Sequence, residues 1–290
     1  MEENAIRYLN SELKAHLESF IRDFLKRHFR SRKLFLYSTL QTSPELLVKI
    51  CHGLLKVIPP TPYEVYETKE LQQTLKRKSH YKDAVEDIST KLALGLPVWP
   101  YQSSKILLLE HCDPLLAGWD IYHFHLSTEK DPKNPSFFKR TDDLLFAMRK
   151  GKYFLLLDIL PHKWKSFIDT YLLEIAKKYW PQAVPTFKGS LAYIPKPKHH
   201  YDLVNRRHIN VSPQGNSEVY IPVGVTLDGT AIKAVNTALQ LWRYVNNNEV
   251  AIKYEIGKQY GAEFFIVVRS YIWQIAYGNE SRIFFYLPLL

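Results

Sequence analysis

The chain has 290 residues, 46% hydrophobic and 23% charged, which is enough apolar material for a large core and argues against a mostly disordered protein. A net charge of +10, from 39 basic and 29 acidic residues, favours a polyanionic partner. Two cysteines exclude a disulfide framework, no apolar stretch reaches the ~20 residues of a membrane helix, and no signal peptide is visible. We therefore expect a cytoplasmic protein with no membrane partner.

The first third, residues 1–100, has mainly helical patterns. Apolar residues recur at three- and four-residue steps near the N-terminus, and Ser43 followed by Pro44 is typical of a helix start. Four helices are expected, over residues 2–30, 43–57, 64–77 and 80–95, with a short strand at 33–37. We predict that this segment is a helical region.

The middle third, residues 101–181, changes to strand patterns. Strands are expected at residues 105–110, 120–126, 144–149 and 153–160, with a polar loop at 128–136. Lys150-Gly151-Lys152 is a compact turn signal, and it predicts that the last two strands form a hairpin. One amphipathic helix is expected over residues 163–180. We predict a central α+β segment that contains the candidate site.

The last third, residues 182–290, begins within a proline-rich stretch at 181–197, which predicts an irregular crossing. Strands are expected near 203–211 and 218–226, a helix near 231–247, and a hairpin that pairs 263–277 with 281–288. The fold class is α+β: a helical N-terminal region followed by mixed, largely antiparallel sheet segments with flanking helices. The three segments either form separate domains or pack as one body.

Histidines supply the candidate site, since seven of the 11 lie between positions 111 and 208. His123 and His125 are two positions apart on an expected strand and so share one face. If the three central strands are neighbours, His162 and Arg140 come to the same place. Imidazoles can act as general base and general acid in RNA cleavage, while a guanidinium stabilises the phosphate charge. This predicts a ribonuclease that needs no metal or cofactor and leaves a 2′,3′-cyclic phosphate.

A resemblance covers residues 120–165. The stretch His125-Leu126, Arg140, Leu144-Leu145-Phe146, Gly151, Leu155-Leu156-Leu157-Asp158-Ile159 and His162 resembles the β-meander of RelE-type ribonuclease toxins. The resemblance implies a basic, twisted antiparallel sheet that cuts RNA without a metal, with Arg140 and His162 catalytic or in contact with phosphate. The chain is far longer than a typical member, and a helix follows the meander where a basic tail is expected. A toxin or phage-defence hydrolase also implies an acidic antitoxin or an inhibitor, because a free ribonuclease harms its host.

A second hypothesis is a nucleic-acid-binding protein without catalysis. Basic residues stand beside aromatic rings, as in Lys163-Trp164-Lys165, and such rings can stack on bases or simply fill the core. The residues expected to contact nucleic acid are Lys139, Lys163, Lys165, Lys196, Lys198, Arg206 and Arg207.

A third hypothesis is a cupin-like metal-binding protein. Gly118, His123, His125 and Glu129 partly match the first cupin motif, and two histidines with a carboxylate can hold iron, manganese or zinc. The spacing from the glycine is one residue short, and no second histidine motif follows.

Overall fold

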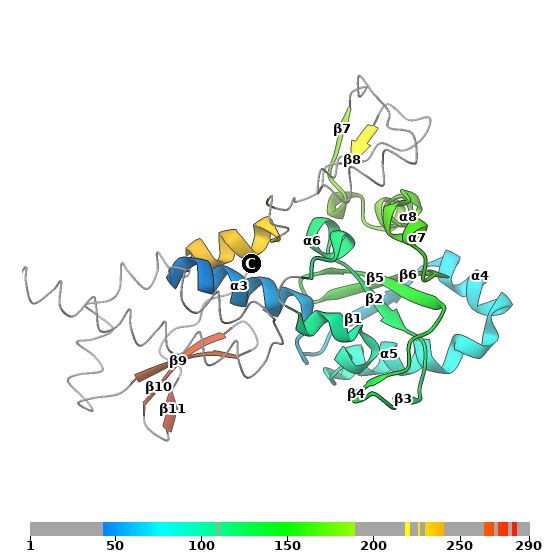
Figure 1. Cartoon of the computed structure of the whole chain (residues 1–290). Helices are drawn as coiled ribbons and strands as arrows, with labels where there is room; N and C mark the ends of the chain where they lie inside the picture. Colours follow the sequence, from blue (N-terminus) through cyan, green and yellow to red (C-terminus); the bar gives the residue numbers. More distant parts are fainter. Residues whose placement is uncertain are drawn as a thin grey trace, which may run out of the picture. The chain divides into compact units, whose positions relative to one another are not determined.

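The computed structural model describes residues 43–108, 111–188, 218–220, 226, 230–240, 264–269, 272–277 and 280–282. The expected helix 2–30 and the expected strands 33–37 and 203–211 lie outside the described residues. The chain divides into two compact units, and the second unit, Lys56–Ile106 with Glu110–Lys233, contains the candidate site (Figure 1). Within the described ranges, no helix is both long and apolar enough to cross a membrane.

A four-stranded sheet in the order β1-β6-β5-β2 is the centre of the second unit. The strands are β1 (Glu64–Glu67), β2 (Ile121–His125), β5 (Asp143–Lys150) and β6 (Tyr153–Pro161). β2, β5 and β6 pair antiparallel, while β1 pairs parallel to β6. The predicted α+β class with a mixed, largely antiparallel sheet is confirmed.

Successive strand residues face two different helical layers, as the period of a strand requires. One face packs against α4 (Lys69–Arg77) and α5 (Lys82–Leu94), and the other against α6 (Pro114–Trp119) and α8 (Tyr171–Tyr179). Figure 1 shows α6, α7 and α8 on one side of the sheet and α5 on the other. On β2, Phe124 faces α5 whereas Ile121 faces the α6 and α8 side, which we call the α8 face.

The β5–β6 hairpin forms as the sequence predicts. Its turn is Gly151-Lys152, and Gly151 has φ 57°, a conformation that glycine adopts without strain. A bulge then interrupts the pairing, since Phe146 lies opposite Asp158 while Ala147 lies opposite Leu156. Leu157 packs in the α8 cluster and Asp158 accepts a hydrogen bond from the Tyr171 hydroxyl of α8 at 2.8 Å. Two consecutive residues therefore point to the α8 face, and the alternation of β6 is reversed beyond them.

Local capping explains where the helices begin and end. The Thr68 hydroxyl accepts the Leu71 N–H at 3.1 Å and starts α4. The expected helix 64–77 is therefore wrong in its first turn, where Glu64–Glu67 instead forms β1 beside β6. Gly95, at φ 69°, ends α5, which follows a 3-10 turn at Ser79–Tyr81.

Three expectations for the central segment need correction. The described part of its first expected strand, residues 105–108, includes a 3-10 helix, Ser104–Leu107; within it only Ile106 is buried, and Leu108 is 39% exposed. The expected loop 128–136 contains a small hairpin, β3 (Lys130–Asp131) with β4 (Asn134–Phe138). The expected helix 163–180 divides into α7 (Trp164–Ile168) and α8, because Asp169 is extended and its carboxylate accepts the Tyr171 N–H at 3.1 Å.

The remaining described elements follow the sequence prediction in part. A 3-10 turn forms at Trp99–Tyr101 and another at Pro181–Ala183, and β7 (Thr186–Lys188) pairs antiparallel with β8 (Glu218–Tyr220). Residues 232–240 are helical, as expected.

In the first unit, α3 (Ser43–Lys56) begins at the predicted Ser-Pro pair. β9 (Phe264–Arg269), β10 (Ile272–Tyr277) and β11 (Glu280–Arg282) form an antiparallel sheet. The expected single strand 263–277 is wrong, because its described residues form two strands, β9 and β10, which pair with each other. The expected hairpin with 281–288 forms in part, between β10 and β11.

Candidate active site

Three imidazoles gather on the α8 face, around Phe167 of α7. His123 and His125 both lie on β2, as predicted, and His162 follows the end of β6. The rings of His125 and His162 are 5.3 Å apart, centroid to centroid, and the ring of Phe167 lies 5.3 Å from His123 and 6.1 Å from His162. The structure thus brings together the three histidines that the sequence singled out.

Arg140 joins this group from the loop before β5. Its side chain is exposed. Burial, followed by the charge of Arg140 and that of His123, holds the pKa of His162 below its ordinary value. The charge of Arg140 also contributes to the lowered pKa of His125.

His125 is enclosed, with 1% of its surface exposed. Its Nδ1 accepts the backbone N–H of Thr141 at 3.1 Å, which places the imidazole proton on Nε2. Burial, together with the charges of His123, His162 and Arg140, lowers the pKa of His125 to about 3. His125 is therefore neutral at pH 7. Its one ring lone pair, on Nδ1, is used to bind Thr141, the residue that follows Arg140.

Two further hydrogen bonds of Thr141 hold this loop in place. The Leu126 N–H donates to Thr141 Oγ1 at 3.0 Å, and the same hydroxyl donates to the Asp143 carbonyl at 2.5 Å. The backbone beside Arg140 is thus fixed to both β2 and β5.

His123 has a carboxylate partner that the sequence interpretation missed. Its Nδ1 lies 2.9 Å from Asp113 Oδ2, and both side chains are mostly buried. Asp113 also caps α6, because its Oδ1 accepts the N–H groups of Leu115 at 3.0 Å and Leu116 at 3.2 Å. Burial alone would raise the pKa of Asp113, but the charge and hydrogen bond of His123 and the helix N–H hold it below its ordinary value. The Asp113-Pro114 pair is a helix-start signal that could have revealed this residue.

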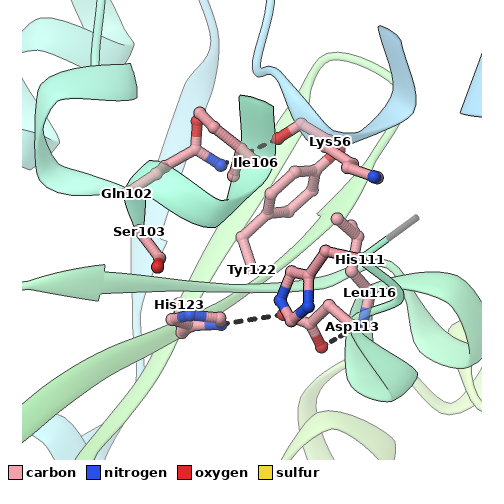
Figure 2. Close-up of a pocket in the computed structure, with 9 residues that line it drawn as sticks. All are labelled: Lys56, Gln102, Ser103, Ile106, His111, Asp113, Leu116, Tyr122 and His123. Carbon is pink, nitrogen blue, oxygen red and sulfur yellow. Dashed lines mark hydrogen bonds and ion pairs between the residues drawn. The ribbon is translucent and has the colours of Figure 1, made fainter. Parts of the chain in front are cut away.

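A pocket opens beside His123, and Figure 2 shows its lining residues. His111 also lies in this pocket. Burial lowers the pKa of His111 to about 4; the charge of Asp113 opposes the shift and that of Lys105 adds to it. Lys105 is exposed, and its charge also lowers the pKa of His162. Lys105 was not among the predicted site residues, because residues 105–110 were expected to form a strand.

The residues predicted to contact nucleic acid are only partly described. Lys163 and Lys165 are exposed at the start of α7, directly after His162. Lys139 is also exposed but forms an ion pair with Glu129. The other four, Lys196, Lys198, Arg206 and Arg207, lie outside the described residues.

The cupin-like ligand set is not assembled around the two histidines. Glu129, its carboxylate, is bound to Lys139 on the surface, with 71% of its side chain exposed. In the part of the chain that the structure describes, no group of three or more His, Cys, Asp or Glu side chains is placed to hold a metal ion.

No protein-family model, curated protein or solved structure matches this chain. Fold and site therefore define only a class, an α+β protein with a histidine cluster at one sheet edge. The case for a function rests on the chemistry of that cluster.

Proposed function

We propose that the chain is a metal-independent endoribonuclease. One observation carries the proposal: His123, backed by the carboxylate of Asp113, lies on the same face as His162, whose pKa the charge of Arg140 lowers. A base, an acid and a cation in one place are the parts that cleavage of a phosphodiester by its own 2′-hydroxyl requires.

His123 acts as the general base in this mechanism. Because Nδ1 faces Asp113, the other nitrogen, Nε2, takes the proton of the ribose 2′-hydroxyl. The 2′-oxygen then forms a bond to phosphorus. Asp113, held ionised by its partners, stabilises the imidazolium that results.

His162 acts as the general acid. As the bond from phosphorus to the 5′-oxygen breaks, His162 donates a proton to that oxygen, which leaves a 2′,3′-cyclic phosphate and a 5′-hydroxyl. The pKa of His162 lies below its ordinary value, so its protonated form is a stronger acid than a free imidazolium. Arg140 stabilises the charge on the phosphate oxygens.

His125 takes a positioning role instead of the catalytic one that the sequence suggested. Its lone pair is bound to the Thr141 N–H, and its side chain is enclosed. It holds the loop that presents Arg140, and it packs against His162 at 5.3 Å.

Cleavage of single-stranded RNA in excess chelator tests this mechanism. His123→Ala and His162→Ala should each lower the rate by about 10²–10⁴-fold, the usual worth of one acid or base. His80→Ala is the matched control, because His80 is an exposed histidine on the opposite helical layer. Full activity in both site variants would contradict the assignment. Activity lost with chelator and restored by a divalent metal would replace it with the metal hypothesis.

The exposed cations favour RNA as the substrate. Arg140, Lys163, Lys165 and Lys105 stand on or beside the elements that carry the site. Lys105→Gln should raise KM for RNA and weaken its salt dependence, with kcat nearly unchanged, because a surface lysine contacts phosphate in ground and transition states alike. An unchanged KM would remove Lys105 from the binding surface.

A non-catalytic nucleic-acid-binding protein is the second candidate, favoured by the exposed Lys163 and Lys165. It predicts salt-sensitive RNA binding with no turnover, and histidine variants that bind as the wild type does.

We also propose a toxin or defence setting for the ribonuclease. An acidic antitoxin or inhibitor then follows from the need to restrain it. Expression of the wild-type chain should slow growth of the host, and the His162→Ala variant should relieve the effect. Equal growth with both chains would argue against this setting.

A further inference from the structure

The ring of Phe167 contacts both the proposed base and the proposed acid. Phe167 lies on α7, and its ring centroid is 5.3 Å from that of His123 and 6.1 Å from that of His162. The ring planes of Phe167 and His123 are nearly perpendicular, at 86°, while those of Phe167 and His162 are tilted by 50°. One apolar side chain therefore packs against two imidazoles that come from different strands.

The position of this ring is fixed by its contacts with β5 and β6. Phe146 of β5 is fully buried and makes a T-shaped contact with Phe167, with 5.5 Å between the ring centroids. The Ser166 hydroxyl donates to the Pro161 carbonyl at 2.6 Å, which holds α7 against the end of β6. Since His162 follows Pro161 directly, the helix that carries Phe167 is anchored beside the proposed acid.

The orientation of His123 depends on more than its carboxylate partner. An imidazole acts as a base only when the correct nitrogen points to the reacting hydroxyl. Asp113 binds Nδ1 of His123 at 2.9 Å, and the ring of Phe167 packs against the same imidazole. The ion pair sets which nitrogen faces the carboxylate, and the packed ring restricts rotation of the imidazole about that pair.

The contact of Phe167 with His162 also limits the access of water. His162 is half-buried, and burial is the main cause of its lowered pKa. Because Phe167 packs against this imidazole, it supplies part of that burial. The other groups that act on His162 are the charges of Arg140, His123 and Lys105, which lower its pKa, and a backbone hydrogen bond to Thr141, which raises it.

We propose that Phe167 is a positioning residue for RNA cleavage, which holds the imidazoles of His123 and His162 in their working orientations and keeps bulk water from them. The inference rests on the proposed ribonuclease function. Phe167 has no group that can move a proton or bind phosphate, so it acts only through the two histidines. Lys163 and Lys165, which we expect to contact RNA, are exposed at the start of the same helix. α7 thus supplies both a contact for the substrate and the ring that orients the base and the acid.

Phe167→Ala tests the proposal by kinetics and by NMR. It should lower kcat for single-stranded RNA by about 10²-fold, the loss that a misplacement of about 1 Å can cause, with KM nearly unchanged. In the ligand-free chain it should raise the pKa of His162 toward its ordinary value, because water then reaches the imidazole. Trp180→Ala is the matched control, since Trp180 is half-buried and packs against the apolar cluster of the α8 face. It should lose stability but show neither change.

Two further measurements cover the case in which Phe167→Ala fails to fold. Phe167→Leu keeps apolar bulk without a ring, and it should lower kcat in the same direction but by less. In the wild-type chain, NMR cross-relaxation should connect the ring protons of Phe167 with those of His123 and of His162. The proposal is overturned by a missing connection, by a rise in KM alone, or by variants with unchanged kcat and an unmoved His162 titration.

These outcomes separate the role of Phe167 from the ribonuclease function itself. If the wild-type chain cleaves RNA and the Phe167 variants behave like it, only the role of Phe167 is wrong. If the wild-type chain cleaves nothing while Phe167→Ala still raises the pKa of His162, the ribonuclease function is wrong and the effect of Phe167 on His162 holds.

Discussion

Replacing Asp113 with asparagine separates its structural role from its chemical one. Asparagine keeps an oxygen for the Leu115 and Leu116 N–H groups, which Asp113 Oδ1 now accepts at 3.0 and 3.2 Å. Since Asn and Asp cap helices about equally well, Asp113→Asn should change stability little. The other oxygen, 2.9 Å from His123 Nδ1, becomes an NH₂ group. Only an unprotonated Nδ1 can accept from that group, so the proton of His123 moves to Nε2.

This tautomer change removes the proposed base. With Nε2 protonated, His123 has no lone pair for the 2′-hydroxyl, and the rate should fall by about 10²–10⁴-fold. Asp113→Ala should lose the same activity and the cap as well, worth about 0.5–2 kcal/mol, or a Tm lower by about 1–8 °C.

Two assays give the comparison, thermal unfolding and RNA cleavage in excess chelator. The helix-capping role of Asp113 is separate from its catalytic role only if Asp113→Asn unfolds near the wild-type Tm but cleaves RNA slowly. Wild-type activity in Asp113→Asn would show that the pair of Asp113 and His123 is structural. A large fall in Tm for Asp113→Asn would show instead that the ionised pair holds the fold.

The direction in which pH changes the stability contributed by Asp113 also follows from its pKa shift. The pKa of Asp113 is lowered in the folded chain, so its contribution to stability is present above the unfolded value of about 4 and is lost as the pH falls through the folded pKa. In Asp113→Asn, that loss at acid pH should be absent from the urea unfolding curve.

Three further predictions use the same residues and two turns. Arg140→Gln should raise the pKa of His162 toward its ordinary value in an NMR titration, and an unmoved curve would place the guanidinium elsewhere. His125 is buried in its neutral form with a pKa of about 3, so between about pH 3 and 6.5 the unfolded chain binds a proton that the folded chain does not. The free energy of unfolding should therefore fall on acidification by up to about 1.4 kcal/mol per pH unit. His125→Asn should reduce that slope, measured by urea unfolding. Gly151→Ala should lower the free energy of unfolding by about 1 kcal/mol, because of its φ of 57° alone. Gly95→Ala should lower it by more, because the added Cβ would lie 2.7 Å from a proline nitrogen. Equal losses of stability in the two variants would show that the proline moves aside.

The β-bulge explains why the sequence predicts the position of His123 and His125 in the histidine cluster but not that of His162. Two-residue spacing places His123 and His125 on one face of a strand, and the structure agrees. Strict alternation along β6 from Leu157 on the α8 face would place His162 on the opposite face. The bulge at Leu157 and Asp158 reverses the alternation, and Leu160 then packs on the α8 side. Nothing in a run of apolar residues marks where such an extra residue falls.

The burial of the site histidines could not be predicted from the sequence either. The histidine count predicts titratable groups, but it does not tell that His125 is enclosed or that its Nδ1 is bound to Thr141. Those facts depend on the β2–β5 pairing and on the loop that returns to it. The end of α5 and the β5–β6 hairpin were predictable because Gly95 and Gly151 mark them locally. β1 was not, because its pairing with β6 is a distant contact.

The product of cleavage tests the central claim most directly. A single-stranded RNA and the same strand with 2′-deoxynucleotides are incubated with the wild-type chain in excess chelator, and the ends are identified by mass spectrometry. The proposed mechanism predicts cleavage of the RNA only, with a 2′,3′-cyclic phosphate on one fragment and a 5′-hydroxyl on the other. Cleavage of the deoxy strand, a 5′-phosphate on the product, or no cleavage of either strand would contradict it.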